Sequence, residues 1–213
     1  ICGITEEELH NVFDNEVALL AENNDQTKEE AYKELKKRYD GYHFSENSVG
    51  IYNPFSILLA LKNSNYGSYW FSTGTPTYLV ELLKRFDYSL ENLSGYEASA
   101  TTLDSIQLNV DNPIPVLYQS GYLTIKGYDR ELRLYTLDFP NEEVEEGFVN
   151  FLIPMYTSVS EMDSPSFIGK FVREVRAGKV DDFMRRLQSM MADTPYEIIK
   201  DLENHYQNVM FIL

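Results

Sequence analysis

The stretch 112–151 constrains the fold most, because less than a quarter of the chain there encodes a helix, two short strands and another helix. Asn112 is a residue type that caps helices, and Pro113 suits the first helical position, where a missing N–H costs nothing. Gly121 stands where a residue with left-handed backbone would end that helix. The pattern therefore predicts a short helix that stops before residue 122.

A β-hairpin is predicted directly after this helix, at 122–137. The runs 122–125 and 132–137 are rich in β-branched and aromatic residues, and the turn-forming residues 127–130 separate them. Two such runs joined by a short turn are expected to pair as antiparallel strands.

The second helix of this stretch is predicted from Asn141 to about residue 159. Asn141 follows a proline and can cap the helix, and Glu142 and Glu143 lie in its first turn, where the helix dipole favours acids. Its apolar face is expected to consist of Val144, Phe148, Phe151, Leu152 and Met155.

Helices are also predicted on both sides of this stretch. Thr5 with Glu8, and Thr27 with Glu30, form two capping boxes, which predict an antiparallel helix pair over about 5–22 and 27–39. The first of these helices should bury Leu9, Val12, Phe13, Val17 and Leu20.

A third N-terminal helix should begin at Asn53-Pro54, be defined by Phe55, Leu58, Leu59 and Lys62, and end at 63–67. A small hairpin is also expected over 42–52.

The C-terminal part is predicted to form helices that begin near Ser164, Asp181 and Thr194. Together with the helix after Asn141 they indicate a bundle or arm. The expected inward positions are Ile168, Phe171, Val172, Val175, Phe183, Met184, Leu187, Met191, Ile198, Leu202, Tyr206, Val209 and Leu213.

The chain is acidic, with a formal net charge of -16. This charge argues against broad binding to nucleic acid or anionic membranes, which depends on Lys and Arg contacts to phosphate. Basic residues do gather on two successive predicted helices, where a solvated helix face is favoured over a polyanion patch. They are Lys170, Arg173, Arg176, Lys179, Arg185 and Arg186.

A single cysteine, Cys2, allows no disulfide within the chain and suits a reducing compartment. No apolar run is long enough to cross a bilayer. A cytoplasmic location is therefore expected.

The segment Trp70–Pro76 offers two interpretations. Thr75 can cap a helix that starts at Pro76, with a buried stripe of Leu79, Leu82, Leu83 and Phe86. Gly74 and Pro76 then only shape a corner between loop and helix, and spacing alone favours this explanation. Alternatively, Gly74 allows close backbone approach to a ligand and Pro76 offers it a rigid apolar surface.

Five phrases of the sequence together resemble a bacterial family of AAA-ATPase-like proteins, whose members usually continue into a PD-(D/E)xK nuclease-like domain. They are ICGITEEEL at 1–9, YDGYHFS with IYNPFS within 39–56, YWFSTGTPTYLVELL at 69–83, LYQSGYLTI at 117–125 and YTLDFPNEEV at 135–144. The matches cover most of the chain in the expected order, which makes them more specific than any single short motif.

The resemblance implies a function for Gly74 and Pro76. Their Gly-x-Pro spacing resembles a motif in the helical domain of NTPases related to the AAA class, where the proline touches the adenine of bound nucleotide. ATP is therefore the expected cofactor, and both explanations of this segment stay open. The glycine-rich phosphate loop that family members carry before ICGITEEEL does not occur in this sequence.

The end of the chain also carries a resemblance. HYQNVMFIL at 205–213 is similar to the first helix of the nuclease-like domain, whose carboxylate-lysine centre lies outside this sequence. Glu203 is a weak candidate for an outlying acid of that centre.

Other candidates for chemistry have simpler explanations. His10, His43 and His205 are far apart and show no metal-ligand spacing. Asp138, with Glu142 and Glu143, suits solvation and the helix dipole better than a cation site. Tyrosines around the hairpin favour packing over base stacking, because few basic residues accompany them.

We therefore expect a mainly α fold with a small β-hairpin. It should comprise a helical lid unit at 1–87, a winged-helix-like unit at 88–159 with its hairpin at 122–137, and a helical arm at 160–213. The expected function is a non-catalytic regulatory segment that contributes to nucleotide sensing. Its expected partners are an upstream ATPase core, through which ATP is bound, and a downstream nuclease-like domain.

Two alternative functions remain. One is a winged-helix-like module that binds nucleic acid, which the net charge disfavours, or a protein; the other is a pure scaffold.

Overall fold

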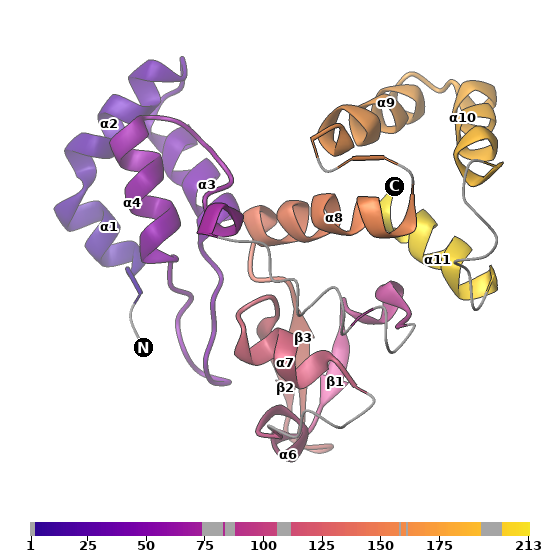
Figure 1. Cartoon of the computed structure of the whole chain (residues 1–213). Helices are drawn as coiled ribbons and strands as arrows, with labels where there is room; N and C mark the ends of the chain where they lie inside the picture. The colour runs from indigo at the N-terminus through magenta and orange to yellow at the C-terminus, as the bar shows by residue number, and fades with distance from the viewer. Residues whose placement is uncertain are drawn as a thin grey trace. The chain divides into compact units, whose positions relative to one another are not determined.

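The structure, a computed structural model, describes residues 3–73, 83, 88–105, 112–157, 159–160, 162–192 and 202–213. It confirms a mainly α-helical fold with a small antiparallel β-sheet (Figure 1). Contacts group the chain into two compact units: the first unit contains 1–75 and 93–147, and the second unit contains 76–92 and 148–213. The three-part domain division expected from the sequence stays a prediction.

Four helices open the first unit: α1 (Glu6–Val12), α2 (Asp14–Asn23), α3 (Lys28–Tyr39) and α4 (Pro54–Asn63). Both predicted capping boxes are present, since Thr5 Oγ1 accepts the Glu8 N–H at 3.1 Å and Glu8 Oε2 accepts the Thr5 N–H at 2.9 Å. Thr27 and Glu30 repeat the arrangement at α3. The helices enclose a core of Leu9, Val17, Leu20, Ala21, Ala31, Leu35, Tyr39, Tyr52, Ile57, Ala60 and Leu61.

The expected single helix after Thr5 is in fact two, because the backbone breaks at Phe13. The break allows Leu9, Val17 and Leu20 to reach the core, whereas Val12 is 64% exposed. The prediction that Val12 is buried was therefore wrong. Strict helical periodicity assumes an unbroken axis, and this segment does not have one.

The predicted helix after Asn53 is present as α4, but it packs through a face that the sequence did not identify. Asn53 Oδ1 caps the helix as expected, accepting the Phe55 and Ser56 N–H groups. However, the buried residues are Ser56, Ile57, Ala60 and Leu61, while Phe55 and Leu58 are exposed. Nearly every position of α4 is apolar, so periodicity alone does not identify which face packs.

The hairpin expected at 42–52 reduces to two isolated bridges. Tyr42 pairs with Ile51, and Tyr52 pairs with Ile4. The second bridge ties the segment before α1 to the segment before α4.

The sheet contains β1 (Tyr96–Ala98), β2 (Thr124–Asp129) and β3 (Leu134–Asp138), all antiparallel, with β3 in the centre. The β2–β3 hairpin confirms the predicted one, although β2 begins two residues later than expected. Its turn falls at 130–133 because Asp129 Oδ1 accepts the Glu131 and Leu132 N–H groups, as in an Asx turn. β1 was not predicted from the sequence.

Short helices lead into this sheet. α6 (Ala100–Leu103) follows β1, and α7 (Ile114–Gln119) precedes β2. Gly121 has φ +82 and ends α7 as predicted. The start lies one residue later than predicted, because Pro113 is the N-cap and Ile114 the first helical residue, while Asn112 Oδ1 accepts the Ile114 N–H at 3.0 Å. The order of helix, hairpin and helix agrees with the expectation, while binding by a winged-helix-like module stays a prediction.

α8 (Glu142–Tyr156) begins in the first unit and continues in the second unit from Phe148. Pro154 lies inside this helix and has no N–H to donate to the Asn150 carbonyl. The end of α8 therefore lacks one hydrogen bond of its ladder.

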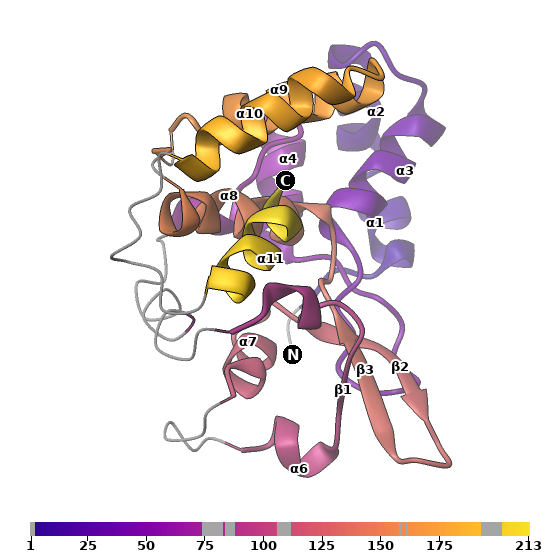
Figure 2. The same cartoon turned by 90° about the vertical axis from the view of Figure 1, so that its right-hand side faces the viewer.

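The second unit continues with α9 (Ser164–Arg176), α10 (Val180–Ala192) and α11 (Leu202–Ile212). α9 and α10 lie side by side as a helical hairpin (Figure 2), joined through Gly178 at φ +67. The core shared by α9, α10 and α11 consists of Phe171, Leu187, Met190 and Val209.

Two expected inward positions, Val175 and Met184, are instead exposed. Ser164 is the first residue of α9 rather than its cap, and its hydroxyl donates to the Ser160 carbonyl. Within the described residues, the structure has no helix both long and apolar enough to span a membrane.

Candidate functional site

Segments that carry the family resemblance meet at the start of α8, in the first unit. The Glu143 side chain is 1% exposed, and its Oε1 accepts the N–H groups of Tyr69 at 2.6 Å and Trp70 at 3.1 Å. Both amides precede or open the short 3-10 helix Trp70–Thr73. A buried carboxylate therefore fixes the backbone that leads to Gly74.

One helical turn later, Gly147 holds the same segment by close approach. A Cβ on Gly147 would lie 2.2 Å from ring carbons of Phe71, so a side chain larger than hydrogen would displace that ring. Glu143 and Gly147 are four residues apart and share one face of α8. The segment 69–71 is thus held at two points of a single helix face.

The Trp70 ring, from the only tryptophan in the chain, lies in an aromatic cluster. It meets Tyr122 edge-on, with ring centroids 4.7 Å apart and planes at 83°, and it makes a similar contact with Phe71 at 5.0 Å. A Cβ on Gly121 would lie 3.7 Å from the rings of both Trp70 and Tyr42. These edge-to-face contacts link residues 69–71, which we call the Trp70 corner, to the segment before β2.

Asn141 joins the segment at Asp40 and Gly41 to the start of α8. Its Nδ2 donates to the Asp40 carbonyl at 3.0 Å, and its Oδ1 caps α8 by accepting the Val144 N–H at 3.1 Å. Gly41, at φ +104, passes so close that a Cβ there would lie 2.1 Å from the Pro140 oxygen. The predicted cap at Asn141 is confirmed and also serves as a link between distant segments.

Burial shifts the acid equilibria of this site. It raises the pKa of Glu143, while the nearby Ser56 hydroxyl and the Tyr69 and Trp70 amides lower it. Glu143 Oε2 and Ser56 Oγ have no partner in hydrogen-bond geometry within the described part of the chain, so Ser56 acts as a nearby dipole. Burial likewise raises the pKa of Asp40, whose Oδ1 has no hydrogen-bond partner among the same residues.

The cation Lys126 accompanies these acids, although its residue surface is largely exposed. Lys126 donates to the Pro140 carbonyl at 2.8 Å, and burial lowers its pKa, against the opposing effect of Asp138 and Asp40. The site therefore combines two buried carboxylates with a partly desolvated ammonium group. Such groups serve structural networks as well as functional ones.

The two residues predicted to contact nucleotide, Gly74 and Pro76, lie outside the described residues. The structure describes the chain up to Thr73, at the end of the short 3-10 helix, and then Leu83, which is fully buried as the predicted stripe requires.

Of the three acids near the hairpin, Glu142 pairs with Lys37 at 2.6 Å and Asp138 accepts the Ser94 hydroxyl at 3.0 Å. Solvation and the helix dipole do not explain Glu143, which faces inward. The sequence held no local signal for this, because Glu142 and Glu143 both occupy the first turn of a helix and the partners of Glu143 are more than 70 residues away.

The histidines do not converge. His10 stacks on Tyr32, His43 Nδ1 lies 2.9 Å from the Ser48 carbonyl, and His205 lies beside Tyr156. Among the described residues, no group of three or more His, Cys, Asp or Glu side chains is arranged to hold a metal ion.

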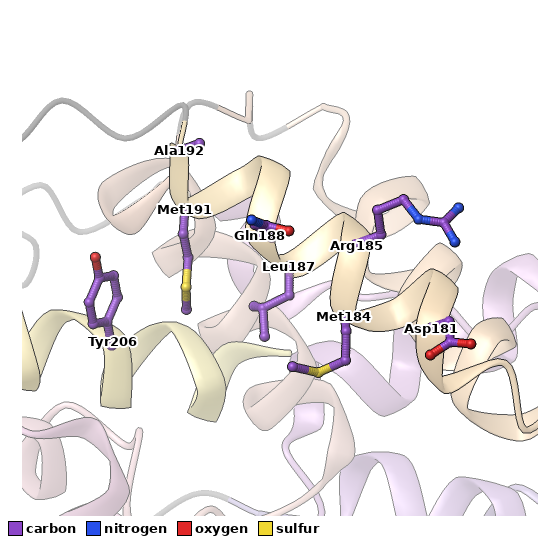
Figure 3. A pocket seen from close by; sticks show the side chains of 8 residues that line it. All are labelled: Asp181, Met184, Arg185, Leu187, Gln188, Met191, Ala192 and Tyr206. Carbon is purple, nitrogen blue, oxygen red and sulfur yellow. The ribbon is translucent and has the colours of Figure 1, made fainter.

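Two concavities lie on the helical hairpin of the second unit. The larger, about 720 Å³, is lined by Asp181, Met184, Arg185, Leu187, Gln188, Met191, Ala192 and Tyr206. Figure 3 shows its apolar side chains, Met184, Leu187 and Met191, projecting from the same side of α10, with Tyr206 of α11 nearby. The smaller, about 330 Å³, is lined by Lys170, Arg173, Glu174, Ala177, Lys179 and Arg186.

Comparison with known proteins gives one informative match. The chain is 31% identical over 161 residues to a protein of Azotobacter chroococcum mcd 1 described as an uncharacterized protein in the vnfD 5' region. The match covers 73% of this chain and 28% of the relative, so this chain spans well under a third of that bacterial protein. No protein-family model and no solved structure matches the chain.

Proposed function

We propose that this chain is a non-catalytic regulatory segment of a longer AAA-ATPase-like protein. In this proposal it closes over nucleotide through Gly74 and Pro76 and passes the nucleotide state to a downstream nuclease-like domain. The observation that carries the proposal is the pair of hydrogen bonds from the Tyr69 and Trp70 amides to the buried Glu143 carboxylate. They connect the backbone before the nucleotide-contact residues to a long helix.

The residues at and near the Trp70 corner have distinct roles in this proposal. Glu143 and Gly147 fix residues 69–71, which precede Gly74 in the sequence. Gly74, without a side chain, lets the backbone approach the ligand, and Pro76 presents a rigid apolar surface to the adenine. ATP would supply the base and the triphosphate, the latter held by an upstream core.

Passing the nucleotide state along the chain requires a connection between its parts, and α8 provides one by sequence. The helix carries Glu143 in its first turn and continues to Tyr156 in the second unit. A change at residues 69–71 would therefore act on a helix that both units share. The length of the similar Azotobacter protein supports a larger parent protein.

Photo-crosslinking with an azidoadenine analogue of ATP tests this proposal in the longer protein that carries the chain. Trypsin cleaves after Lys62 and Lys84, so one peptide, 63–84, contains Trp70, Gly74 and Pro76. We expect labelling of this peptide, and competition by unlabelled ATP.

Matched proline variants separate contact from local structure. Pro76→Ala should reduce labelling of peptide 63–84. Pro54→Ala, at the first position of α4, should leave it unchanged. Labelling confined to other peptides would overturn the proposal, as would steady ATP hydrolysis by this chain alone, because phosphoryl transfer requires a phosphate loop and Mg²⁺ ligands.

A further inference from the structure

The α9–α10 hairpin is basic although the chain as a whole is strongly acidic. Residues 164–192 contain six Lys or Arg and three Asp or Glu, whereas the whole chain has a net charge of -16. This helical hairpin therefore carries more positive than negative charge. The acidic net charge favours a solvated helix face for these residues, but four of them share one concavity.

Four of the six basic side chains line one concavity of about 330 Å³: Lys170, Arg173, Lys179 and Arg186. Lys170 and Arg173 are three residues apart and share a face of α9. The left-handed backbone at Gly178 turns the chain so that Lys179 joins them, and α10 contributes Arg186. Arg176 and Arg185 do not line the concavity, so the clustering is selective.

The one acid in the concavity is already paired. Arg186 Nε lies 2.9 Å and 3.0 Å from the two oxygens of Glu174, and its guanidinium lies 5.9 Å from the Phe171 ring centroid. This pair spans α9 and α10 and anchors Arg186 against the core of the second unit. Lys179 and Arg173 also lower the pKa of Glu174 through space, but only Arg186 among the described residues forms an ion pair with it.

The other three cations of the concavity are available to a ligand. Lys170, Arg173 and Lys179 are exposed, and none has a carboxylate within 4.0 Å in the described part of the chain. The Arg173 guanidinium lies back over Gly169, where an added Cβ would be 3.3 Å from Nη1. Gly169 therefore leaves room for a guanidinium that points along α9.

We propose that this concavity binds a compact phosphate-bearing anion. Arginine offers a planar set of donors that matches phosphate oxygens, and lysine adds a mobile point charge. A compact ligand is favoured over nucleic acid because the rest of the chain is acidic. Physiological salt screens the repulsion from these acids beyond about 8 Å, so a compact anion in the concavity feels little of it. A long polyanion would extend out of the concavity toward the acidic residues and would be repelled.

The phosphate has two possible sources, a soluble ligand or a lipid headgroup. Val175 and Val180 are exposed and lie close in sequence to the basic residues. Such apolar side chains beside cations suit contact with the surface of a lipid bilayer, and they are also compatible with a site in water. The shared chemistry is the phosphate group, and the experiment separates the sources.

Isothermal titration of the full chain with pyrophosphate at low salt tests the proposal. We expect saturable binding that weakens as salt increases. The double variant Arg173→Gln/Lys179→Gln should weaken binding by about tenfold, because each charge removed near the ligand in water changes affinity by a few-fold. Lys170→Gln, at an exposed position within α9, should weaken it by about threefold.

The matched control is Arg176→Gln/Arg185→Gln, which removes the same charge from the same hairpin but outside the concavity. It should change the affinity by less than about twofold. Equal losses in the two double variants would overturn the proposal, because they would show attraction to net charge without a site. Absence of saturable binding at millimolar pyrophosphate would overturn it too.

Two further arms identify the source of the phosphate. Co-sedimentation with vesicles containing phosphatidic acid, competed by pyrophosphate, indicates a lipid headgroup, and pyrophosphate binding without vesicle binding indicates a soluble ligand. Either result supports the phosphate site. Tighter binding of a short DNA duplex than of pyrophosphate, with a steep dependence on salt, would overturn it in favour of a nucleic-acid surface.

Discussion

Removing the Glu143 carboxylate should destabilise the first unit strongly. Glu143→Ala leaves the half-buried amides of Tyr69 and Trp70 without this carboxylate acceptor, and each unsatisfied donor costs about 1–3 kcal/mol. The lost Cγ methylene adds about 0.8 kcal/mol. Relief from burying the carboxylate and the helix propensity of alanine offset part of this loss. We expect a net decrease of about 3 kcal/mol in the free energy of unfolding.

Glu143→Gln serves as the isosteric comparison. The amide keeps one oxygen in place to accept from the Tyr69 and Trp70 N–H groups and removes the charge. Its expected cost is therefore about 1 kcal/mol or less. The difference between the two variants isolates the hydrogen bonds that hold the Trp70 corner.

Urea and thermal unfolding followed by the fluorescence of Trp70 measure this effect where it acts, since no other tryptophan contributes. A loss of about 3 kcal/mol corresponds to a decrease of about 6–12 °C in Tm for a chain of this size. Glu142→Ala is the neighbouring control and breaks only the ion pair with Lys37, worth about 0–1 kcal/mol. The reasoning fails if Glu143→Ala stays within about 0.5 kcal/mol of wild type, or if the glutamine variant is equally unstable.

Two further predictions follow. Burial raises the pKa of Glu143 above its ordinary value of 4.5, so the stability from this group is complete below the unfolded pKa and is lost as pH rises through the folded pKa. Urea unfolding over a pH series should therefore show the stability of wild type falling relative to Glu143→Gln as pH rises above about 4.5; a constant difference would contradict this. In the second unit, Asn208 is fully buried, and it accepts the Leu90 N–H at 2.7 Å and donates to the Tyr88 carbonyl at 3.0 Å. Asn208→Ala should cost about 2–4 kcal/mol in thermal melts followed by circular dichroism, and an unchanged melt would show that these bonds contribute little.

Local signals in the sequence predicted the helix starts well. The capping boxes at Thr5 and Thr27, and the caps at Asn53 and Asn141, all form as expected. Each involves residues at most three apart, so the sequence contains the whole interaction. The β2–β3 hairpin was predictable for a similar reason, since both strands and their turn are contiguous.

Features that depend on distant partners were not predictable. Strand β1 has only three residues, Tyr96–Ala98, and becomes a strand by pairing with β3 about 40 residues later. The buried face of α4 depends on which apolar side meets α2 and α3. Glu143 has the same local sequence features as Glu142, and only its distant contacts make it buried.

The candidate site was predicted in part. The sequence drew attention to the segment 69–76, and the structure shows how residues 69–71 are held by Glu143 and Gly147. The contribution of Gly147 was missed, because a glycine inside a helix usually signals only a lower helix propensity. The roles of Gly74 and Pro76 stay predictions.

The proline inside α8 has a mechanical consequence. An α-helix resists bending through an unbroken series of backbone hydrogen bonds, and the rung that would join Pro154 to Asn150 is missing. From its first turn to Asn150, α8 has no proline to interrupt its backbone hydrogen bonds. The helix should bend most easily near Asn150, where one of these bonds is missing. Flexure of this helix should therefore concentrate in its last two turns.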